Sequence, residues 1–165
     1  MQAGCSKRES TLMDIELKKA TIEDCSQLRD FQIRAFESLL DKYQDYEHSP
    51  GAVTLEHIVR CFYESTTDYY FIYLKRTPIG GIRVCNHGQH CQLKQIFILP
   101  EYQNCGYAQV AIKQMEACYP NARKWSLDTI LQEQKLCYLY EKLGYKKTGK
   151  FLNIQQGMDL VFYEK

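Results

Sequence analysis

The chain has 165 residues, of which 45% are hydrophobic, 25% are charged and 13% are aromatic. A chain of this length predicts one globular domain, which buries roughly 70% of its unfolded surface without needing disulfide or metal cross-links. The formal net charge of +1 provides no general attraction to nucleic acid or anionic lipid. No apolar stretch approaches the roughly 20 residues that cross a bilayer. We therefore expect no nucleic-acid or membrane partner.

The sequence contains eight cysteines, and none of them forms a CxxC pair. This spacing argues against a dithiol redox centre or a zinc ribbon. The first residues have no apolar core of the kind found in signal peptides, so we expect reduced thiols and a cytoplasmic protein. Residues 1–12 are polar and lack periodicity, which predicts a disordered extension or a tag before a single domain at residues 13–165.

The first half of that domain predicts a strand followed by two helices. Ile15–Lys18 alternates between apolar and polar residues, as a half-buried strand does, and Thr21 with Asp24 is typical of a helix start. The apolar positions that follow recur mostly at helical spacing, at Leu28, Phe31, Ile33, Phe36, Leu39 and Leu40. After a polar segment at residues 42–51, the sequence from Thr54 to Phe62 predicts a second helix.

The second half predicts mainly strands, interrupted by two helices. Strands are predicted at Tyr69–Leu74, Ile79–Cys85, His90–Leu99, Trp125–Thr129, Tyr145–Phe151 and Met158–Tyr163, and helices at Gly106–Cys118 and Gln132–Leu143. The run from His90 becomes apolar on both faces toward its end, which is typical of a central strand. The predicted order is β-α-α-β-β-β-α-β-α-β-β.

The segment from Ile96 to Ala108 combines a buried strand, a turn and the start of a helix. Backbone N–H groups and the positive end of a helix at such a turn suit a pyrophosphate. Gly106 allows a close backbone approach, and Ala108 leaves the first helical turn uncrowded. An ordinary strand-turn-helix connection without a ligand is the alternative.

Two motifs resemble those of one enzyme family. Gln103-Asn-Cys-Gly-Tyr-Ala108 resembles the Q/R-x-x-G-x-G/A signature of the GNAT superfamily of N-acetyltransferases, and Leu139-Tyr-Glu-Lys-Leu-Gly-Tyr145 resembles its Leu-Tyr-x-x-x-Gly-Phe/Tyr motif. The resemblance extends from Met13 to about Tyr163. It implies an α/β fold with a mixed, mostly antiparallel central sheet flanked by helices.

The resemblance also implies acetyl-coenzyme A as cosubstrate, with no metal. The backbone of one strand would pair with the pantetheine amides, and the following loop would hold the pyrophosphate. The implied coenzyme-binding residues are Ile96, Phe97, Ile98, Gln103, Asn104, Cys105, Gly106, Tyr107, Ala108 and Gln109. Asn104 and Cys105 stand where basic residues are frequent in the family, so the loop depends on its backbone donors.

Two side chains match catalytic positions of the family. Tyr140 matches the tyrosine that protonates the departing thiolate, and a packing role in a Tyr-rich helix is its alternative. Asp128 matches by spacing the glutamate base of the ribosomal-protein acetyltransferase branch, and capping the next helix is its alternative. The resemblance makes the backbone N–H of Ile98 the donor to the oxyanion. Glu133 departs from the family, which often has a coenzyme-binding Asn at this position.

A group of two cysteines and two histidines within residues 85–91 could in principle hold zinc. The turn signal Asn86-His87-Gly88 favours the alternative of a hairpin, with Cys85 and Cys91 on its strands and His87 and His90 at its tip.

The acceptor groove implied by the resemblance lies between the loop of the first two helices and the last hairpin. That loop carries acidic and aromatic side chains, namely Asp41, Tyr43, Asp45, Tyr46 and Glu47, together with His48. Carboxylates and rings suit a cationic amine, and a solvated polar loop is the alternative.

We therefore expect an N-acetyltransferase that acts on a primary amine of a small molecule or protein, by direct attack in a ternary complex, and that is a monomer or homodimer. A non-catalytic acyl-coenzyme A sensor is the alternative function.

Overall fold

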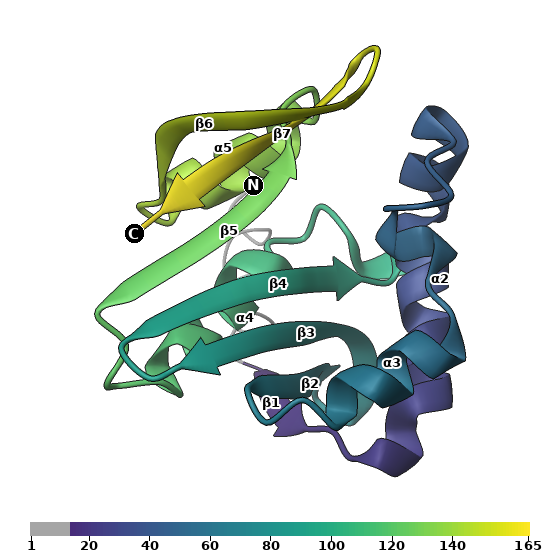
Figure 1. Cartoon of the computed structure of the whole chain (residues 1–165). Helices are drawn as coiled ribbons and strands as arrows, with labels where there is room; N and C mark the ends of the chain where they lie inside the picture. Colours follow the sequence, from purple (N-terminus) through teal and green to yellow (C-terminus); the bar gives the residue numbers. More distant parts are fainter. Residues whose placement is uncertain (1–13) are drawn as a thin grey trace, which may run out of the picture.

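A computed structural model describes residues 14–165, which form one seven-stranded sheet in the order β1-β2-β3-β4-β5-β7-β6 (Figure 1). The strands are β1 (Ile15–Lys19), β2 (Thr67–Leu74), β3 (Thr77–His87), β4 (His90–Ile98), β5 (Lys124–Ile130), β6 (Lys146–Gln155) and β7 (Met158–Glu164). Neighbouring strands are antiparallel except β4 and β5, which are parallel. The predicted fold class is confirmed. The extension predicted at residues 1–12 lies outside the described residues.

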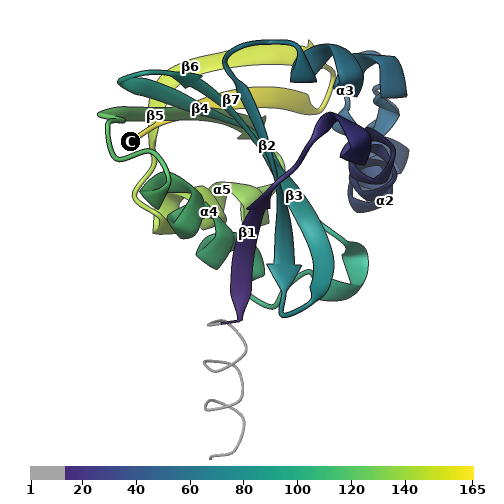
Figure 2. The ribbon, with the colours of Figure 1, turned by 90° about the horizontal axis from the view of Figure 1, so that it is seen from below.

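Helices cover both faces of the sheet (Figure 2). The helices are α2 (Cys25–Tyr43), α3 (Leu55–Phe62), α4 (Tyr107–Ala117) and α5 (Gln134–Lys142), with short 3-10 turns at Ile22–Asp24, Pro50–Ala52 and Pro100–Tyr102. Helices α4 and α5 pack on the larger core cluster, and α2 and α3 pack on the smaller one. Of these helices, none is both long and apolar enough to cross a membrane.

The predicted element order agrees with the structure, whereas many boundaries differ by one to a few residues, as three examples show. The last helix begins at Gln134 and not at Gln132, because the Gln132 side chain bonds to Asp159 and Glu133 is the N-terminal cap. Strand β6 continues to Gln155, beyond the predicted end at Phe151, although most of its residues are exposed. Strand β3 reaches His87, because the hairpin with β4 is tighter than predicted.

The parallel pairing of β4 with β5 ends after three residue pairs, the last of which is Gln92 with Ser126. Beyond that pair β5 follows β7, its antiparallel neighbour as far as Ile130. On its other side β4 contains a bulge, because Val84 faces Leu93 while Arg83 faces Gln95, which leaves Lys94 unpaired. A bulge bends a strand and increases its twist. Strands β4 and β5 therefore separate beyond Gln92 and Ser126, where β4 also bends.

Two glycines of β3 allow the closest approach to β4. A Cβ atom on Gly81 would lie 2.5 Å from the Phe97 ring, which covers this glycine. A Cβ atom on Gly80 would collide with the backbone carbonyl oxygen of Phe97. Since a ring can turn but a paired backbone cannot move alone, Gly80 is the stricter requirement.

The first prediction concerns this contact. Gly80→Ala should lower the free energy of unfolding by about 1–3 kcal/mol or more, because the added methyl group displaces β4 from β3. Urea unfolding would measure the loss, with the exposed Thr77→Ala of the same strand as control. Equal midpoints for Gly80→Ala and wild type would contradict the close contact.

Candidate functional site

A cleft of about 370 Å³ lies where β4 and β5 separate. Its walls come from α2, the end of β4, the loop before α4, and α5. The candidate site residues that line it are Ile96, Phe97, Ile98, Gln103, Asn104, Gly106, Tyr107, Ala108, Gln109 and Tyr140. Cys105 and Asp128 are outside this lining. The structure thus brings together most of a site predicted from two separate motifs.

The backbone of β4 presents free polar groups to the cleft at alternate residues. Leu99 N donates to Ile79 O over 2.8 Å, and Phe97 faces Gly81 in the same register, so the polar groups of Phe97 point to β3. Those of Ile96 and Ile98 therefore point to the gap. The Ile98 carbonyl accepts a 2.8 Å hydrogen bond from Gln103 Nε2. The groups left for a ligand are the N–H and C=O of Ile96 and the N–H of Ile98, whereas Phe97 lines the cleft without a free backbone group.

The loop before α4 forms a cradle of backbone donors. Asn104 and Gly106 adopt left-handed conformations with φ of 60° and 85°. Within residues 14–165, no backbone N–H from Asn104 to Gln109 donates to a protein acceptor, and Val110 N makes the first helical bond, to Gly106 O. Consecutive free N–H groups at a helix start bind anions.

Tyr140 lines the cleft from α5 and is only 7% exposed. Its ring packs near Tyr145 and Tyr163, with centroid distances of 6.2 and 6.3 Å. Burial, followed by the nearby charges of Asp128 and Cys137, raises the pKa of the Tyr140 phenol. The phenol therefore keeps its proton at neutral pH.

Asp128 lies on β5, on the sheet face opposite the buried Trp125 and Leu127. The residue is exposed, but the protein atoms around its carboxyl displace water. This desolvation raises the pKa of the Asp128 carboxyl, and the positive charge of Lys94 partly offsets the increase. A carboxyl with a raised pKa is a better proton acceptor than an ordinary surface aspartate.

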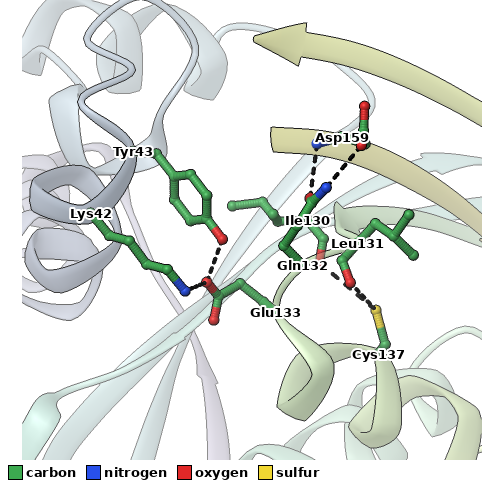
Figure 3. A network of polar contacts seen from close by, with 8 residues as sticks. All are labelled: Lys42, Tyr43, Ile130, Leu131, Gln132, Glu133, Cys137 and Asp159. Atoms are coloured by element: carbon green, nitrogen blue, oxygen red, sulfur yellow. Dashed lines mark hydrogen bonds and ion pairs between the residues drawn. The ribbon is translucent and has the colours of Figure 1, made fainter. Parts of the chain in front are cut away.

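The side chain of Glu133, at the start of α5, bonds to two residues at the end of α2 (Figure 3). Its Oε1 atom accepts 2.6 Å hydrogen bonds from Lys42 Nζ and from the Tyr43 hydroxyl. Desolvation opposes ionisation of Glu133, but the bonds from Lys42 and Tyr43 outweigh it and lower its pKa. The carboxylate in the cleft wall is thus balanced by a cation. Sequence reasoning missed this contact, because its partners lie 91 and 90 residues away.

The loop that precedes Glu133 is hydrogen-bonded to the last hairpin (Figure 3). Gln132 Nε2 donates to Asp159 Oδ2 over 2.8 Å, and Asp159 N donates to Gln132 Oε1 over 2.9 Å. Gln155 Nε2 donates to the Tyr43 carbonyl over 2.6 Å. The end of α2, the start of α5 and the hairpin of β6 and β7 therefore hold one another in place.

In the loop predicted to receive the acceptor, one of the carboxylates bonds to the loop itself. Asp45 is only 6% exposed, and its Oδ1 accepts bonds from the backbone N–H groups of Glu47 and His48. His48 Nδ1 also lies 3.1 Å from Asp45 Oδ1. Asp45 thus stabilises the loop, in which Tyr46 and Glu47 are exposed. Asp41 and Tyr43, predicted to belong to this loop, lie instead in the last turn of α2, which continues to Tyr43.

The segment at residues 85–91 forms the predicted hairpin. Cys85 and Cys91 are buried, His87 and His90 are exposed, and the Asn86 side chain accepts a 2.9 Å bond from Gly88 N in the turn. Residues 14–165 contain no group of three or more His, Cys, Asp or Glu side chains placed to hold a metal ion.

The second prediction follows from the lowered pKa of Glu133. Because its folded-state pKa is below the unfolded value of about 4.3, Glu133 stabilises the fold above that pH, and the contribution disappears as the pH falls through the folded-state pKa. Glu133→Gln should therefore be less stable than wild type at pH 7 and approach wild type below about pH 4. Chemical unfolding across pH would test this, with the exposed Glu47→Gln as control. A stability difference that does not vary with pH would contradict the ionic contribution.

Comparison with solved structures identifies the fold. A spermidine N-acetyltransferase from Vibrio cholerae, solved with CoA and spermine, is 17% identical, covers 93% of this chain and 95% of its own, and has a TM-score of 0.71. An acetyltransferase from Thermus thermophilus is 15% identical with a TM-score of 0.68, over 94% of this chain and 98% of its own. The PaiA N-acetyltransferase from Thermoplasma acidophilum, solved with coenzyme A, is 17% identical with a TM-score of 0.68, over 92% and 99%.

No curated protein sequence matches the chain significantly. The model of the acetyltransferase (GNAT) family, in contrast, matches residues 27–145, which include the cleft, the N–H cradle and Tyr140. The chain therefore belongs to the GNAT acetyltransferase family.

Proposed function

We propose that the protein is an N-acetyltransferase that moves an acetyl group from acetyl-coenzyme A to a primary amine of a small molecule or protein. The observation that carries this proposal is one cleft that joins an N–H cradle, a free strand edge and a buried phenol. The Thermoplasma and Vibrio relatives described above, solved with coenzyme A, support it.

The cleft residues fit this cosubstrate. The free N–H groups from Asn104 to Gln109 would hold the pyrophosphate, and no acidic side chain lies in that loop to repel it. Ile96 would pair with the pantetheine amides through its N–H and C=O, as an edge strand pairs with an added strand, which leaves the N–H of Ile98 for the acyl group. Phe97 and Gln103 would contribute by shape, since Phe97 has its backbone in the β3 ladder and Gln103 bonds to Ile98. Cys105 would take part only through its backbone N–H.

The coenzyme supplies an acetyl thioester, and the remaining chemistry belongs to the chain. Direct attack by the amine forms a C–N bond and breaks the C–S bond. Asp128 would take the proton that the amine loses, directly or through a water. The N–H of Ile98 would donate to the developing oxyanion, and Tyr140 would protonate the departing thiolate.

A non-catalytic acyl-coenzyme A sensor is the competing function. It is favoured by Cys105 in the loop and by a carboxylate, Glu133, in the cleft wall. The bonds from Lys42 and Tyr43 weaken the second reason, because they balance that charge. Thiol release across a panel of polyamines, amino acids, aminoglycosides and peptides distinguishes the two functions. Release with none of them would favour the sensor.

The third prediction concerns coenzyme binding. Coenzyme A should bind saturably in an equilibrium titration, and Ala108→Asp should weaken binding about tenfold or more, because it places a negative charge at the helix start. Ala117→Asp, the same change at the exposed end of α4, is the control and should bind as wild type does. Absence of saturable binding at millimolar ligand would exclude the proposed function.

The fourth prediction concerns Tyr140. Tyr140→Phe should lower kcat about 100-fold with little change in the Kd of coenzyme A, because only protonation of the leaving group is lost. Tyr138→Phe, on the exposed side of the same helix, is the matched control. Unchanged turnover in Tyr140→Phe would remove this residue from the mechanism.

A further inference from the structure

Lys94 and Asp128 occupy equivalent places on the two strands that separate. The last parallel pair is Gln92 with Ser126, and each of the two charged residues lies two positions beyond it on its own strand. Leu93 and Leu127, which precede them, are both buried in the core under α4 and α5. Lys94 and Asp128, in contrast, are both exposed, and the positive charge of Lys94 is close enough to act on the Asp128 carboxyl. They are therefore neighbours across the point of separation.

The bulge accounts for the position of Lys94. Leu93 pairs with Val84 and Gln95 pairs with Arg83, so Lys94 between them has no partner on β3. Bulges alter the direction of a side chain at the place where pairing is interrupted. This bulge places an exposed lysine at the level of Asp128.

Few other charged groups face Asp128. From β7, its partner Phe162 is apolar, and Lys150 of β6 lies with its ammonium over the Phe162 ring at 4.6 Å from the centroid. From α5, the Tyr140 phenol is close enough for the Asp128 charge to raise the phenol pKa. Among residues 14–165, neither Lys94 nor Asp128 makes an ion pair within 4.0 Å with any group, including each other. Lys94 thus acts on Asp128 through space, and no other carboxylate competes for it at contact distance.

We propose that Lys94 is a positioning residue for Asp128. The ammonium of Lys94 keeps the Asp128 carboxyl ionised where β4 and β5 separate. This inference rests on the proposed function for its catalytic meaning, since it makes Asp128 ready to accept the proton of the attacking amine. Lys94 keeps its own proton throughout, and no bond to it forms or breaks.

The expected effect on pH dependence has a definite sign. A base works only when deprotonated, so activity falls as the pH drops through its pKa. Desolvation alone would raise the pKa of Asp128 further, and the ammonium of Lys94 limits that increase. Removing the charge of Lys94 should therefore move the acidic limb of the pH–rate profile to higher pH.

The fifth prediction tests this without relying on activity. The carboxyl carbon of Asp128 would be followed by NMR during a pH titration of the full chain, with its signal assigned by the loss of that signal in Asp128→Asn. Lys94→Met should shift the Asp128 titration to higher pH, and Lys94→Arg should restore it. Lys150→Met, which removes a lysine from the same face, should leave it unchanged. An Asp128 titration that is the same in Lys94→Met and wild type would overturn the proposal.

Kinetics separate this proposal from the proposed function. With an active acceptor, the acidic limb of kcat/KM should move to higher pH in Lys94→Met, return in Lys94→Arg and be absent in Asp128→Asn. A shifted NMR titration with no turnover of any amine by the wild type would exclude the enzyme but retain the coupling. Turnover with an unmoved acidic limb would retain the enzyme and exclude the role of Lys94. Lys94→Gln provides a second neutral variant if Lys94→Met does not fold.

Discussion

The parallel pairing of β4 with β5 stops at Gln92 and Ser126, and the rest of the site depends on this interruption. A continuous sheet would satisfy the backbone groups of Ile96 and Ile98 internally and leave no space between the strands. Because β5 follows β7 instead, the N–H and C=O of Ile96 and the N–H of Ile98 remain free at the wall of a cleft. The bulge at Lys94, on the β3 side of β4, bends the strand at the same level. The end of β4–β5 pairing therefore creates the space and its polar wall, and the bulge on the β3 side places Lys94 at the level of Asp128.

Charge around the cleft is balanced locally and not by a general excess of basic residues. The net charge of the chain is only +1, and the loop from Gln103 to Gln109 contains no ionised side chain. Free backbone N–H groups at the start of α4 can hold phosphates without basic side chains. Glu133 is matched by Lys42 and Tyr43, so its carboxylate does not leave the cleft wall with an unpaired negative charge. The neutrality of the whole chain is thus compatible with a polyanionic ligand.

Sequence reasoning predicts the parts of the fold that depend on local patterns. The element order follows from periodicity and turn residues, and the strand, loop and helix from Ile96 to Gln109 follow from a contiguous motif. The parts that it does not predict depend on contacts between distant residues. The hydrogen bond from Lys42 to Glu133 joins residues 91 positions apart. Gln132, predicted as the first residue of the last helix, lies outside it and bonds to Asp159. Likewise, no local pattern distinguishes Asp45, which stabilises its own loop, from Asp41, which stays exposed.

The ring of Phe97 lies over Gly81 and also lines the cleft. The absence of a side chain on Gly81 therefore sets how deeply this ring sits, and so determines part of the shape of the cleft. The capacity of the cleft is controlled in part from a strand that does not line it.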